Sequence, residues 1–277
     1  MTYIRKEVIG AATLYLGDCV TVLENLKGKV NAVVTSPPYD DIRDYGSHAP
    51  VNCFTVINCI SQILLSGGVC VWNVSDQTKD GSETGTSFRH ALHAKECGLR
   101  LHDTMIVCKE GVTSPSSNRY HPAFEYVFIF SKGAPAHFNG IKDWKNKTAD
   151  RSLKGGSHRR KDGTLKPIST IGKKTPSEGL RRNWWITSNP YIGETEGHPA
   201  PMSNKLAADH ITTWTDQSEI VLDPFMGSGT TGIACAKLGR NFVGIEIHGP
   251  YFDIACRRIE QAQRQSDLFI RQPEAAV

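Results

Sequence analysis

The chain has 277 residues, of which 39% are hydrophobic and 22% are charged, which is ordinary for a globular protein with a real core. It contains no apolar run of about 18 residues and no apolar segment near the start of the kind that signal peptides have. The sequence therefore predicts a cytoplasmic protein that does not enter the membrane. The eight cysteines form no CxxC pair and several lie in apolar segments, so we expect reduced thiols and no metal site.

The net charge of +4 is unevenly distributed along the chain. Residues 140–185 contain thirteen Lys or Arg and four Asp or Glu, a balance of +9 that leaves −5 for the remainder. A basic segment in an acidic body favours a local surface for a polyanion. A solvated loop is the alternative that charge alone leaves open.

The first half of the chain alternates between predicted strands and helices. It predicts, in order, a strand, a turn and a helix in residues 12–26, a strand in 29–39, a helix in 51–68 that stops at Gly67-Gly68, a strand in 68–76, a helix in 87–98, and two strands in 101–110 and 124–133 that pair as a hairpin.

The second half opens with residues 131–190, a polar, basic stretch with little periodicity. So long a segment without regular structure is unusual in a compact domain unless it has a function or is disordered. Residues 198–211 predict a helix, 219–239 a strand, a glycine-rich turn and a helix, and 240–265 one more strand and helix. This alternation predicts an α/β protein with a mostly parallel, Rossmann-like sheet and helices on both faces.

Polar residues follow several of the predicted strands. Ligands of such sheets bind at the carboxyl ends of the strands. The residues at or near these ends are Asp18, Ser36 to Tyr39, Asp76, Asp223 and Glu246. We expect them to share one edge of the sheet.

The turn in residues 220–232, IVLDPFMGSGTTG, contains the pattern GxGxxG from Gly227 to Gly232. The pattern is typical of dinucleotide sites, so a nicotinamide oxidoreductase has to be considered. Asp223-Pro224-Phe225 argues against it, because a pyrophosphate disfavours a carboxylate beside it, and no lysine follows the glycines as in a P-loop. S-adenosylmethionine has no phosphate and suits this turn: Asp223 would take its ammonium group and Glu246 its ribose hydroxyls.

The sequence TSPPY, ending at Tyr39, follows an apolar strand. Proline lacks a backbone donor and restricts the residue before it, so these residues form a stiff, extended exit from the strand. An ordinary strand end is one interpretation. A rigid cup that presents carbonyl oxygens and an aromatic face to a ligand is the other.

These motifs together resemble the β-group of exocyclic-amino DNA methyltransferases, in which the catalytic motif precedes the cofactor motif. TSPPY, the later DPFMGSGTT, LYLGDC, HPAPMSNKLA and VGIEI carry the resemblance, which covers most of the chain. It implies residues 1–130 as the catalytic half, 131–190 as a target-recognition insert and 191–277 as the cofactor-binding half. One departure is His248, which stands where an acid often follows the ribose-binding residue.

The resemblance also implies a role for each motif. The cofactor-binding residues would be Asp18, Asp223, Phe225, Gly227, Ser228, Gly229, Thr230, Glu246, His198 and Pro199. The catalytic residues would be Ser36, Pro37, Pro38 and Tyr39. A base flipped out of DNA would stack on Tyr39, while Ser36 and the Pro37 carbonyl accept protons of its amine and Pro38 keeps that carbonyl rigid.

The resemblance implies double-stranded DNA as the partner, and a homodimer is plausible because family members often dimerise. The predicted DNA-binding residues are Arg151, Arg159, Arg160, Lys161, Arg181 and Arg182. Ser36 as the first catalytic residue is frequent in N4-cytosine enzymes, whereas the longer run from residue 82 to 133 looks like phage-type and solitary adenine enzymes. We favour N6 of adenine over N4 of cytosine. A DNA-binding protein without activity and an RNA substrate are further alternatives.

Overall fold

The computed structural model describes residues 3–26, 29–38, 51–109, 118–152, 154–168, 171–187 and 202–270. Two compact units emerge: one comprises residues 1–139 and 183–277, and the other comprises Gly140–Arg182. The predicted insert of residues 131–190 is longer than this second unit, because the residues on either side of it belong to the first unit.

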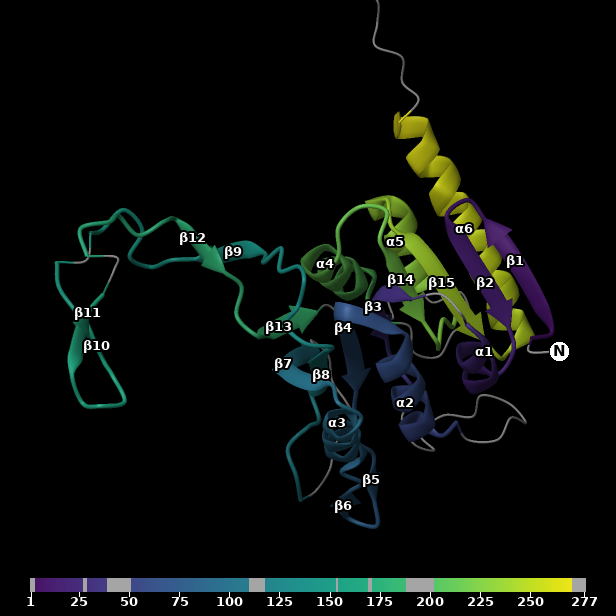
Figure 1. Cartoon of the computed structure of the whole chain (residues 1–277), viewed down its shortest axis with the longest axis horizontal. Helices are drawn as coiled ribbons and strands as arrows, with labels where there is room; N and C mark the ends of the chain where they lie inside the picture. Colours follow the sequence, from purple (N-terminus) through teal and green to yellow (C-terminus); the bar gives the residue numbers. More distant parts are fainter. Residues whose placement is uncertain are drawn as a thin grey trace, which may run out of the picture. The chain divides into compact units, whose positions relative to one another are not determined.

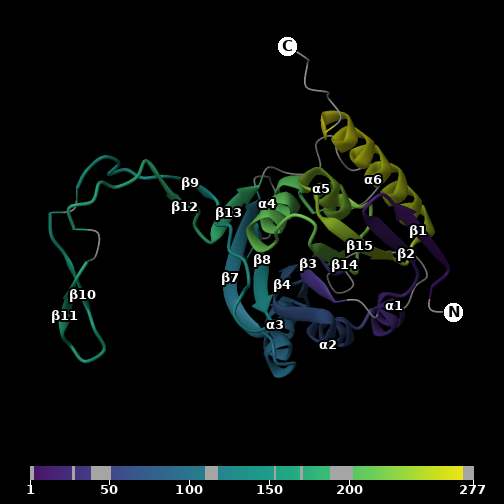
Figure 2. The same ribbon diagram turned by 45° about the horizontal axis from the view of Figure 1, so that its top comes forward.

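Within the described residues of the first unit, nine strands form one sheet in the order β1-β2-β15-β14-β3-β4-β8-β7-β13. The strands from β2 to β4 in this order are mutually parallel, as are β7 and β13. Figure 2 shows β14 between β3 and β15. The strands are β1 (Arg5–Ile9), β2 (Ala12–Leu16), β3 (Val30–Thr35), β4 (Leu64–Val74), β7 (Arg100–Lys109), β8 (Phe124–Ser131), β13 (Trp184–Thr187), β14 (Ile220–Asp223) and β15 (Asn241–Glu246). This confirms the predicted α/β fold with a mostly parallel sheet.

Helices cover both faces of this sheet (Figure 1). One apolar cluster lies between the sheet and α4, α5 and α6, and a second lies between the sheet and α1, α2 and α3. The helices are α1 (Cys19–Asn25), α2 (Cys53–Ile63), α3 (Thr86–Glu96), α4 (Asn204–Trp214), α5 (Thr230–Leu238) and α6 (Gly249–Ile270). Among the described residues, no helix is both long and apolar enough to cross a lipid bilayer. All eight cysteines are free thiols.

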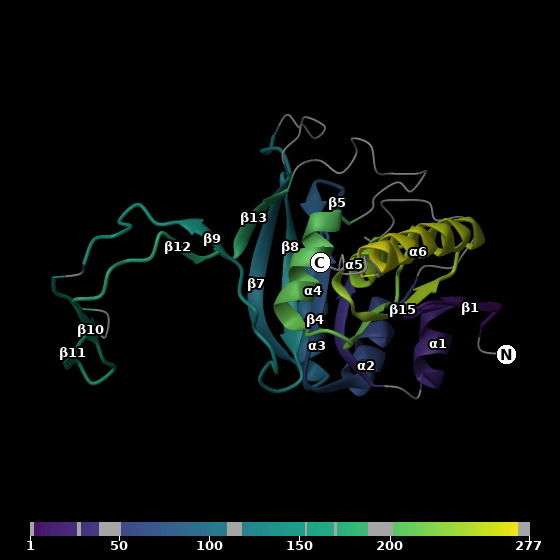
Figure 3. The ribbon, with the colours of Figure 1, turned by 90° about the horizontal axis from the view of Figure 1, so that it is seen from above.

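The predicted strands and helices mostly correspond to observed ones, including the antiparallel hairpin of β7 and β8. Two strands of the large sheet were not expected. β1 pairs with β2 in an antiparallel hairpin, and β13 adds a parallel edge beside β7 (Figure 3). β13 is short and begins inside the basic segment, so its apolar residues show no clear period of their own.

The prediction that the helix of residues 51–68 stops at Gly67-Gly68 is wrong. The helix ends at Ile63 and β4 begins at the next residue. Gly67 has φ of +81°, and a Cβ on Gly68 would lie 2.8 Å from the carbonyl oxygen of Asn31. The pairing of β3 with β4 shifts register at this point. The two glycines therefore mark a bulge where neighbouring strands approach closely.

The strands described in the second unit form short antiparallel pairs. β9 (Lys142–Lys145) pairs with β12 (Glu178–Leu180), and β10 (Ser157–Arg159) pairs with β11 (Leu165–Pro167). The described side chains of this unit are mostly exposed, which fits a segment that the sequence predicts to be polar and without a core of its own. A further short pair, β5 (Thr78–Lys79) with β6 (Ser82–Glu83), belongs to the first unit.

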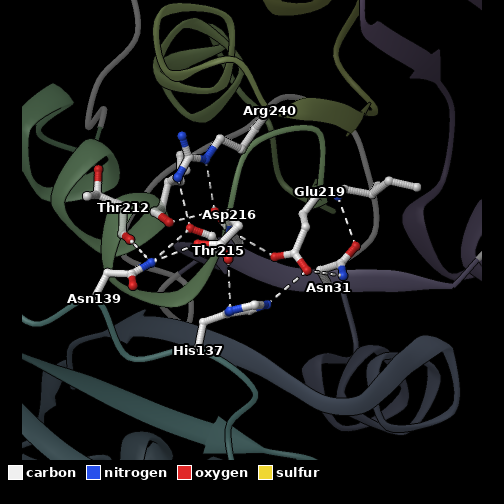
Figure 4. Close-up of polar contacts among 10 residues, drawn as sticks. Asn31, His137, Asn139, Thr212, Thr215, Asp216, Glu219 and Arg240 are labelled. Atoms are coloured by element: carbon white, nitrogen blue, oxygen red, sulfur yellow. Dashed lines mark hydrogen bonds and ion pairs between the residues drawn. The ribbon is translucent and has the colours of Figure 1, made fainter.

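A polar network fixes the chain of the first unit just before residue 140 (Figure 4). The His137 ring lies 3.2 Å from Asp216 and 3.1 Å from Glu219. The Asn139 amide donates to Asp216 Oδ1 and to the carbonyl of Thr212.

Glu219 is the centre of this network. Its carboxylate also accepts from the Asn31 amide at 2.8 Å and from the backbone N–H of Asp216 at 2.9 Å. Asn31 Oδ1 in turn accepts from the N–H of Ile220, so the network joins the amino ends of β3 and β14.

We expect Glu219→Ala to lower the free energy of unfolding by about 2 kcal/mol, because several donors lose their acceptor in a half-buried place. Urea denaturation followed by circular dichroism measures this. Glu260→Ala is the control, since Glu260 makes an exposed pair with Arg264 and should cost at most ~0.5 kcal/mol. Equal losses in the two variants would contradict a special role of the network.

Candidate active site

The expected polar residues meet at one edge of the sheet. β2, β15, β14, β3 and β4 are consecutive parallel neighbours, so their carboxyl ends lie side by side. Asp18, Glu246, Asp223, Ser36 and Asp76 stand at or just after these ends in this order. The expectation that the double-proline strand end lies beside the glycine-rich turn is confirmed, because β3 and β14 are adjacent and parallel.

Asp223 joins the two motifs directly. Its carboxylate accepts from the hydroxyl of Thr35 at 2.6 Å, from the hydroxyl of Thr231 at 2.7 Å and from the backbone N–H of Phe225 at 3.0 Å. Asp223 is only 4% exposed, and burial raises the pKa of its carboxyl to about 6 although the three hydrogen bonds oppose this. The buried side chain of Asp223 therefore links the ends of β3 and β14 to the start of α5. Its predicted contact with a ligand ammonium group stays a prediction.

Glu246 holds the glycine-rich turn from the other side. One carboxylate oxygen accepts from the N–H of Gly227 and the other from the N–H of His248, both at 2.8 Å. Burial raises the pKa of Glu246, and these two hydrogen bonds oppose the rise. A carboxylate has about four acceptor positions, so capacity for two further hydroxyl groups remains.

The glycines of the turn are required for different structural reasons. Gly227 and Gly229 have φ of +54° and +88°, values that suit glycine. Gly229 caps the start of α5, and its missing Cβ would lie 3.0 Å from the Cβ of Ala255. A Cβ on Gly232 would lie 2.5 Å from Ile259, so this glycine lets α5 pack closely on α6. The third glycine of the GxGxxG pattern therefore serves packing.

Other predicted cofactor residues also have structural partners. The Asp18 side chain caps α1 by accepting from the N–H and the hydroxyl of Thr21, at 2.8 and 2.9 Å. Ser228 is buried, and Arg258 of α6 donates to its carbonyl and hydroxyl oxygens. Phe225 contacts Trp72 edge to face at 6.3 Å between ring centroids. Thr230 is the buried first residue of α5.

Residues 36–38, which the sequence predicts to be catalytic, directly follow β3 and form no helix. Pro37 is buried, whereas Ser36 and Pro38 are half-buried. Asp76, at the end of β4, accepts from the N–H and hydroxyl of Ser87 and so holds the start of α3. Tyr39, His198 and Pro199 lie outside the described residues.

The predicted DNA-binding residues divide into two groups. Arg181 forms a bidentate ion pair with Asp143, and the guanidinium of Arg182 lies 4.9 Å from the centre of the Trp144 ring. Arg151, Arg159, Arg160 and Lys161 are exposed, the last three at the tip of the hairpin of β10 and β11.

Thr35 and Thr231 are the site residues that sequence reasoning missed. Both lie inside the recognised motifs, TSPPY and GSGTT, but a threonine at a buried strand end or helix start has ordinary structural uses. Only the pairing of β3 with β14 shows that both hydroxyls meet one carboxylate. Trp185 of β13 stacks on His210 of α4, with 4.7 Å between the ring centroids.

The residues of the edge fit S-adenosylmethionine. The turn offers no lysine after its glycines. It does offer the carboxyl groups of Asp223, which is buried, and Glu246, which is half-buried, and carboxylates at this place disfavour a bound phosphate. Glu246 has acceptor positions for hydroxyls, and the glycines leave room for close backbone approach. When bound, S-adenosylmethionine supplies an electrophilic methyl group on sulfur.

The fold and this edge define an S-adenosylmethionine-dependent methyltransferase. A family model described as DNA methylase, N6_N4_Mtase, matches residues 30–257. The chain belongs to this family of exocyclic-amino DNA methyltransferases, and S-adenosylmethionine is its cofactor.

Relatives and solved structures agree with this family. The orphan methyltransferase M.BamHII of Bacillus amyloliquefaciens is 41% identical over 252 residues, which are 88% of this chain and 91% of the relative. Type II methyltransferase M.SmaI of Serratia marcescens is 27% identical, with 89% and 90% covered.

Among solved structures, the complex of M1.HpyAVI with SAM has a TM-score of 0.61 and 26% identity, covering 89% of this chain and 99% of that one. The cytosine-N4-specific PvuII DNA methyltransferase, at 19% identity, shares the fold with a TM-score of 0.65, and 96% of each chain is covered.

We expect Asp223→Asn to remove a pH dependence of stability. The folded-state pKa of about 6 lies above the ordinary 3.8, so the stabilisation by the protonated carboxyl is complete below about pH 4 and is lost as the pH rises through 6. The free energy of unfolding of the wild type should fall by about 3 kcal/mol over this range. Asn has no titrating group, so the variant should not show this fall. Urea denaturation of both proteins between about pH 4 and pH 7 measures the difference.

The control for this prediction is Asp162→Asn. The hydroxyl and N–H of Thr164 lower the pKa of Asp162 below its ordinary 3.8, so its contribution is lost only at a pH below the measured range. The stability difference between wild type and Asp162→Asn should therefore stay constant between about pH 4 and pH 7. A constant stability difference between wild type and Asp223→Asn across this range would show that the folded protein does not hold the proton.

Proposed function

We propose that this chain methylates the exocyclic amine of a base flipped out of double-stranded DNA, at N6 of adenine in preference to N4 of cytosine. The adjacency of the β3 end and the glycine-rich turn, joined through Thr35 and Asp223, is the observation that carries the proposal. It brings an amine-binding strand end and a cofactor-binding turn to one place.

Ser36 and the carbonyl of Pro37 are the acceptors for the amine protons. An exocyclic amine is a poor nucleophile because its lone pair is delocalised into the ring, and two fixed acceptors draw the nitrogen toward tetrahedral geometry. Pro37 is buried and Pro38 restricts the backbone, so these dipoles are preorganised. Tyr39 stacks on the flipped base.

On the cofactor side, Glu246 accepts the ribose hydroxyls and Asp18 lies at the adenine end. Gly227, Ser228, Gly229 and Thr230 shape the turn around the amino-acid end, with Phe225, His198 and Pro199 beside it. Asp223 acts by holding the turn against β3, since its carboxylate already accepts three hydrogen bonds.

The choice of base rests on a balance of likenesses. Ser36 is frequent in cytosine enzymes, and the PvuII enzyme of the same fold is named as cytosine-N4-specific. The run from residue 82 to 133 looks like solitary adenine enzymes, and M.BamHII is named an orphan methyltransferase. We weigh the longer run more heavily because it covers more of the chain.

The basic unit of Gly140–Arg182 is proposed as the target-recognition region. Arg159, Arg160, Lys161 and Arg151 would contact phosphates, which attract most protein–DNA hydrogen bonds. Arg181 and Arg182 would support this surface through their contacts with Asp143 and Trp144. A homodimer is proposed from family resemblance alone.

The test is digestion of DNA that the enzyme has methylated, with mass spectrometry of the nucleosides. We expect N6-methyladenine. N4-methylcytosine would overturn the base preference, and the lack of any methylated nucleoside would overturn the function. Ser36→Ala should lower turnover by at least about ten-fold without weakening cofactor binding. Ser61→Ala is the control, because the Ser61 hydroxyl donates to the Asn58 carbonyl within its own helix, α2.

We expect the triple variant Arg159→Ala, Arg160→Ala, Lys161→Ala to bind DNA more weakly and with a flatter salt dependence. Each phosphate that the variant no longer neutralises reduces the slope of log K against log salt by about 0.9. Fluorescence anisotropy of labelled DNA between about 50 and 300 mM salt measures this slope. A triple alanine variant of Lys95, Lys237 and Arg264, exposed cations of the other unit, should keep the wild-type slope.

A further inference from the structure

A polar triad with two buried members lies at the same carboxyl edge, on the side of β3 away from the cofactor turn. The Asn73 amide donates to Glu125 Oε2 at 3.0 Å, and the ammonium group of Lys109 pairs with Glu125 Oε1. Asn73 is near the end of β4, Glu125 near the start of β8 and Lys109 at the end of β7. The triad therefore runs across three neighbouring strands.

The strand register places Asn73 beside the catalytic residue Ser36. Thr35 pairs with Trp72 in the parallel ladder of β3 and β4, so the next residues, Ser36 and Asn73, are neighbours. Val34 and Val71 belong to the cluster under α4 and α5. Since side chains alternate along strands, Ser36 and Asn73 point to this same face.

Glu125 and Lys109 belong to this face as well. Val127 of β8 and Val107 of β7, two residues away from them, lie in the same apolar cluster. Asn73 is 3% exposed and Glu125 8%, while the Lys109 side chain is 42% exposed. The triad thus extends from Lys109, which is exposed to solvent, through Glu125 to Asn73, which is buried beside the end of β3.

Burying the carboxylate of an ion pair is a poor means of stabilising a fold, because apolar residues of similar size are often as good or better. Its advantage is orientation. A carboxylate only accepts, so Glu125 fixes which end of the Asn73 amide faces it, and the carbonyl end of that amide faces away. Lys109 in turn fixes the carboxylate of Glu125.

We propose that Asn73, Glu125 and Lys109 are positioning residues for methyl transfer, which hold the substrate side of the catalytic strand end in its reactive geometry. The proposal rests on the proposed function. Lys109 orients Glu125, Glu125 orients Asn73, and Asn73 sets the surroundings of Ser36. The triad lies on the opposite side of β3 from β14 and β15, so we expect it to act on the substrate side and not on cofactor binding.

The experiment compares single-turnover methyl transfer to DNA with binding of S-adenosylmethionine. Glu125→Gln keeps the volume but lets either end of the Asn73 amide face it. We expect the transfer rate to fall by about 10- to 100-fold, because small misplacements of reacting groups cause losses of this size. The Kd for S-adenosylmethionine should stay within about two-fold of wild type. Lys109→Met should lower the rate, and Lys109→Arg should restore most of it.

Glu219→Gln is the matched control, because Glu219 forms a comparable bond with Asn31 at the opposite ends of the strands. It should change the Tm to a similar degree and leave the transfer rate unchanged. Wild-type transfer rate in Glu125→Gln and Lys109→Met, measured below the Tm of each variant, would overturn the proposal. Equal loss of rate in Glu219→Gln would do the same. Absence of transfer by the wild type would overturn the proposed function together with the triad.

Discussion

The buried carboxyl group of Asp223 is the interaction on which the site depends. The TSPPY motif and the glycine-rich motif DPFMGSGTT are separated by 183 residues of the 277-residue chain, and the basic unit of Gly140–Arg182 lies between them in the sequence. In the fold their meeting point is one carboxylate that accepts from Thr35 at the end of β3 and from Thr231 at the start of α5. Removing this group from water is costly, and the three hydrogen bonds offset only part of the cost, as the raised pKa shows. Such a brace keeps two loops in fixed register, and a reaction in line between two bound molecules requires this.

The same edge is divided into two halves by β3. On one side, β14, β15 and β2 carry carboxylates that hold turns and backbone N–H groups, an arrangement suited to hydroxyls and to a ligand without phosphate. On the other side, β4, β8 and β7 carry the triad of Asn73, Glu125 and Lys109. Pro37 and Pro38, which follow β3, restrict the backbone at its end. The chemistry of each half follows from which strands are neighbours, because each strand contributes only one or two residues at its end.

Much of this arrangement could be predicted from the sequence. The alternation of strands and helices indicated the sheet class, and polar residues after apolar runs identified Asp18, Ser36, Asp223 and Glu246 as edge residues. What could not be predicted depends on pairing across the sheet. Nothing in the sequence distinguishes Thr35 or Glu125 from other residues of their type. Their contacts can be recognised only once β3 is known to lie between β14 and β4, and β4 beside β8. Gly67-Gly68 was misread for the same reason: a glycine pair looks alike at a helix end and at a bulge, and only the neighbouring Asn31 carbonyl distinguishes them.

Two Asn–Glu pairs show how position decides the use of one interaction. Asn31 with Glu219 joins the amino ends of β3 and β14, where the network with His137 and Asn139 fixes the chain before the basic unit begins. Asn73 with Glu125 joins β4 and β8 near the carboxyl edge, beside Ser36. In both pairs a carboxylate orients an amide through its acceptor oxygens, and the carboxylate is half-buried in Glu219 and buried in Glu125. In a parallel sheet the amino ends lie away from the ligand-binding edge, so the first pair can contribute only to the framework. The second pair stands near the carboxyl edge, where the ligands of such sheets bind. This position is why we propose that its cost in burial is matched by control over the geometry of the strand end.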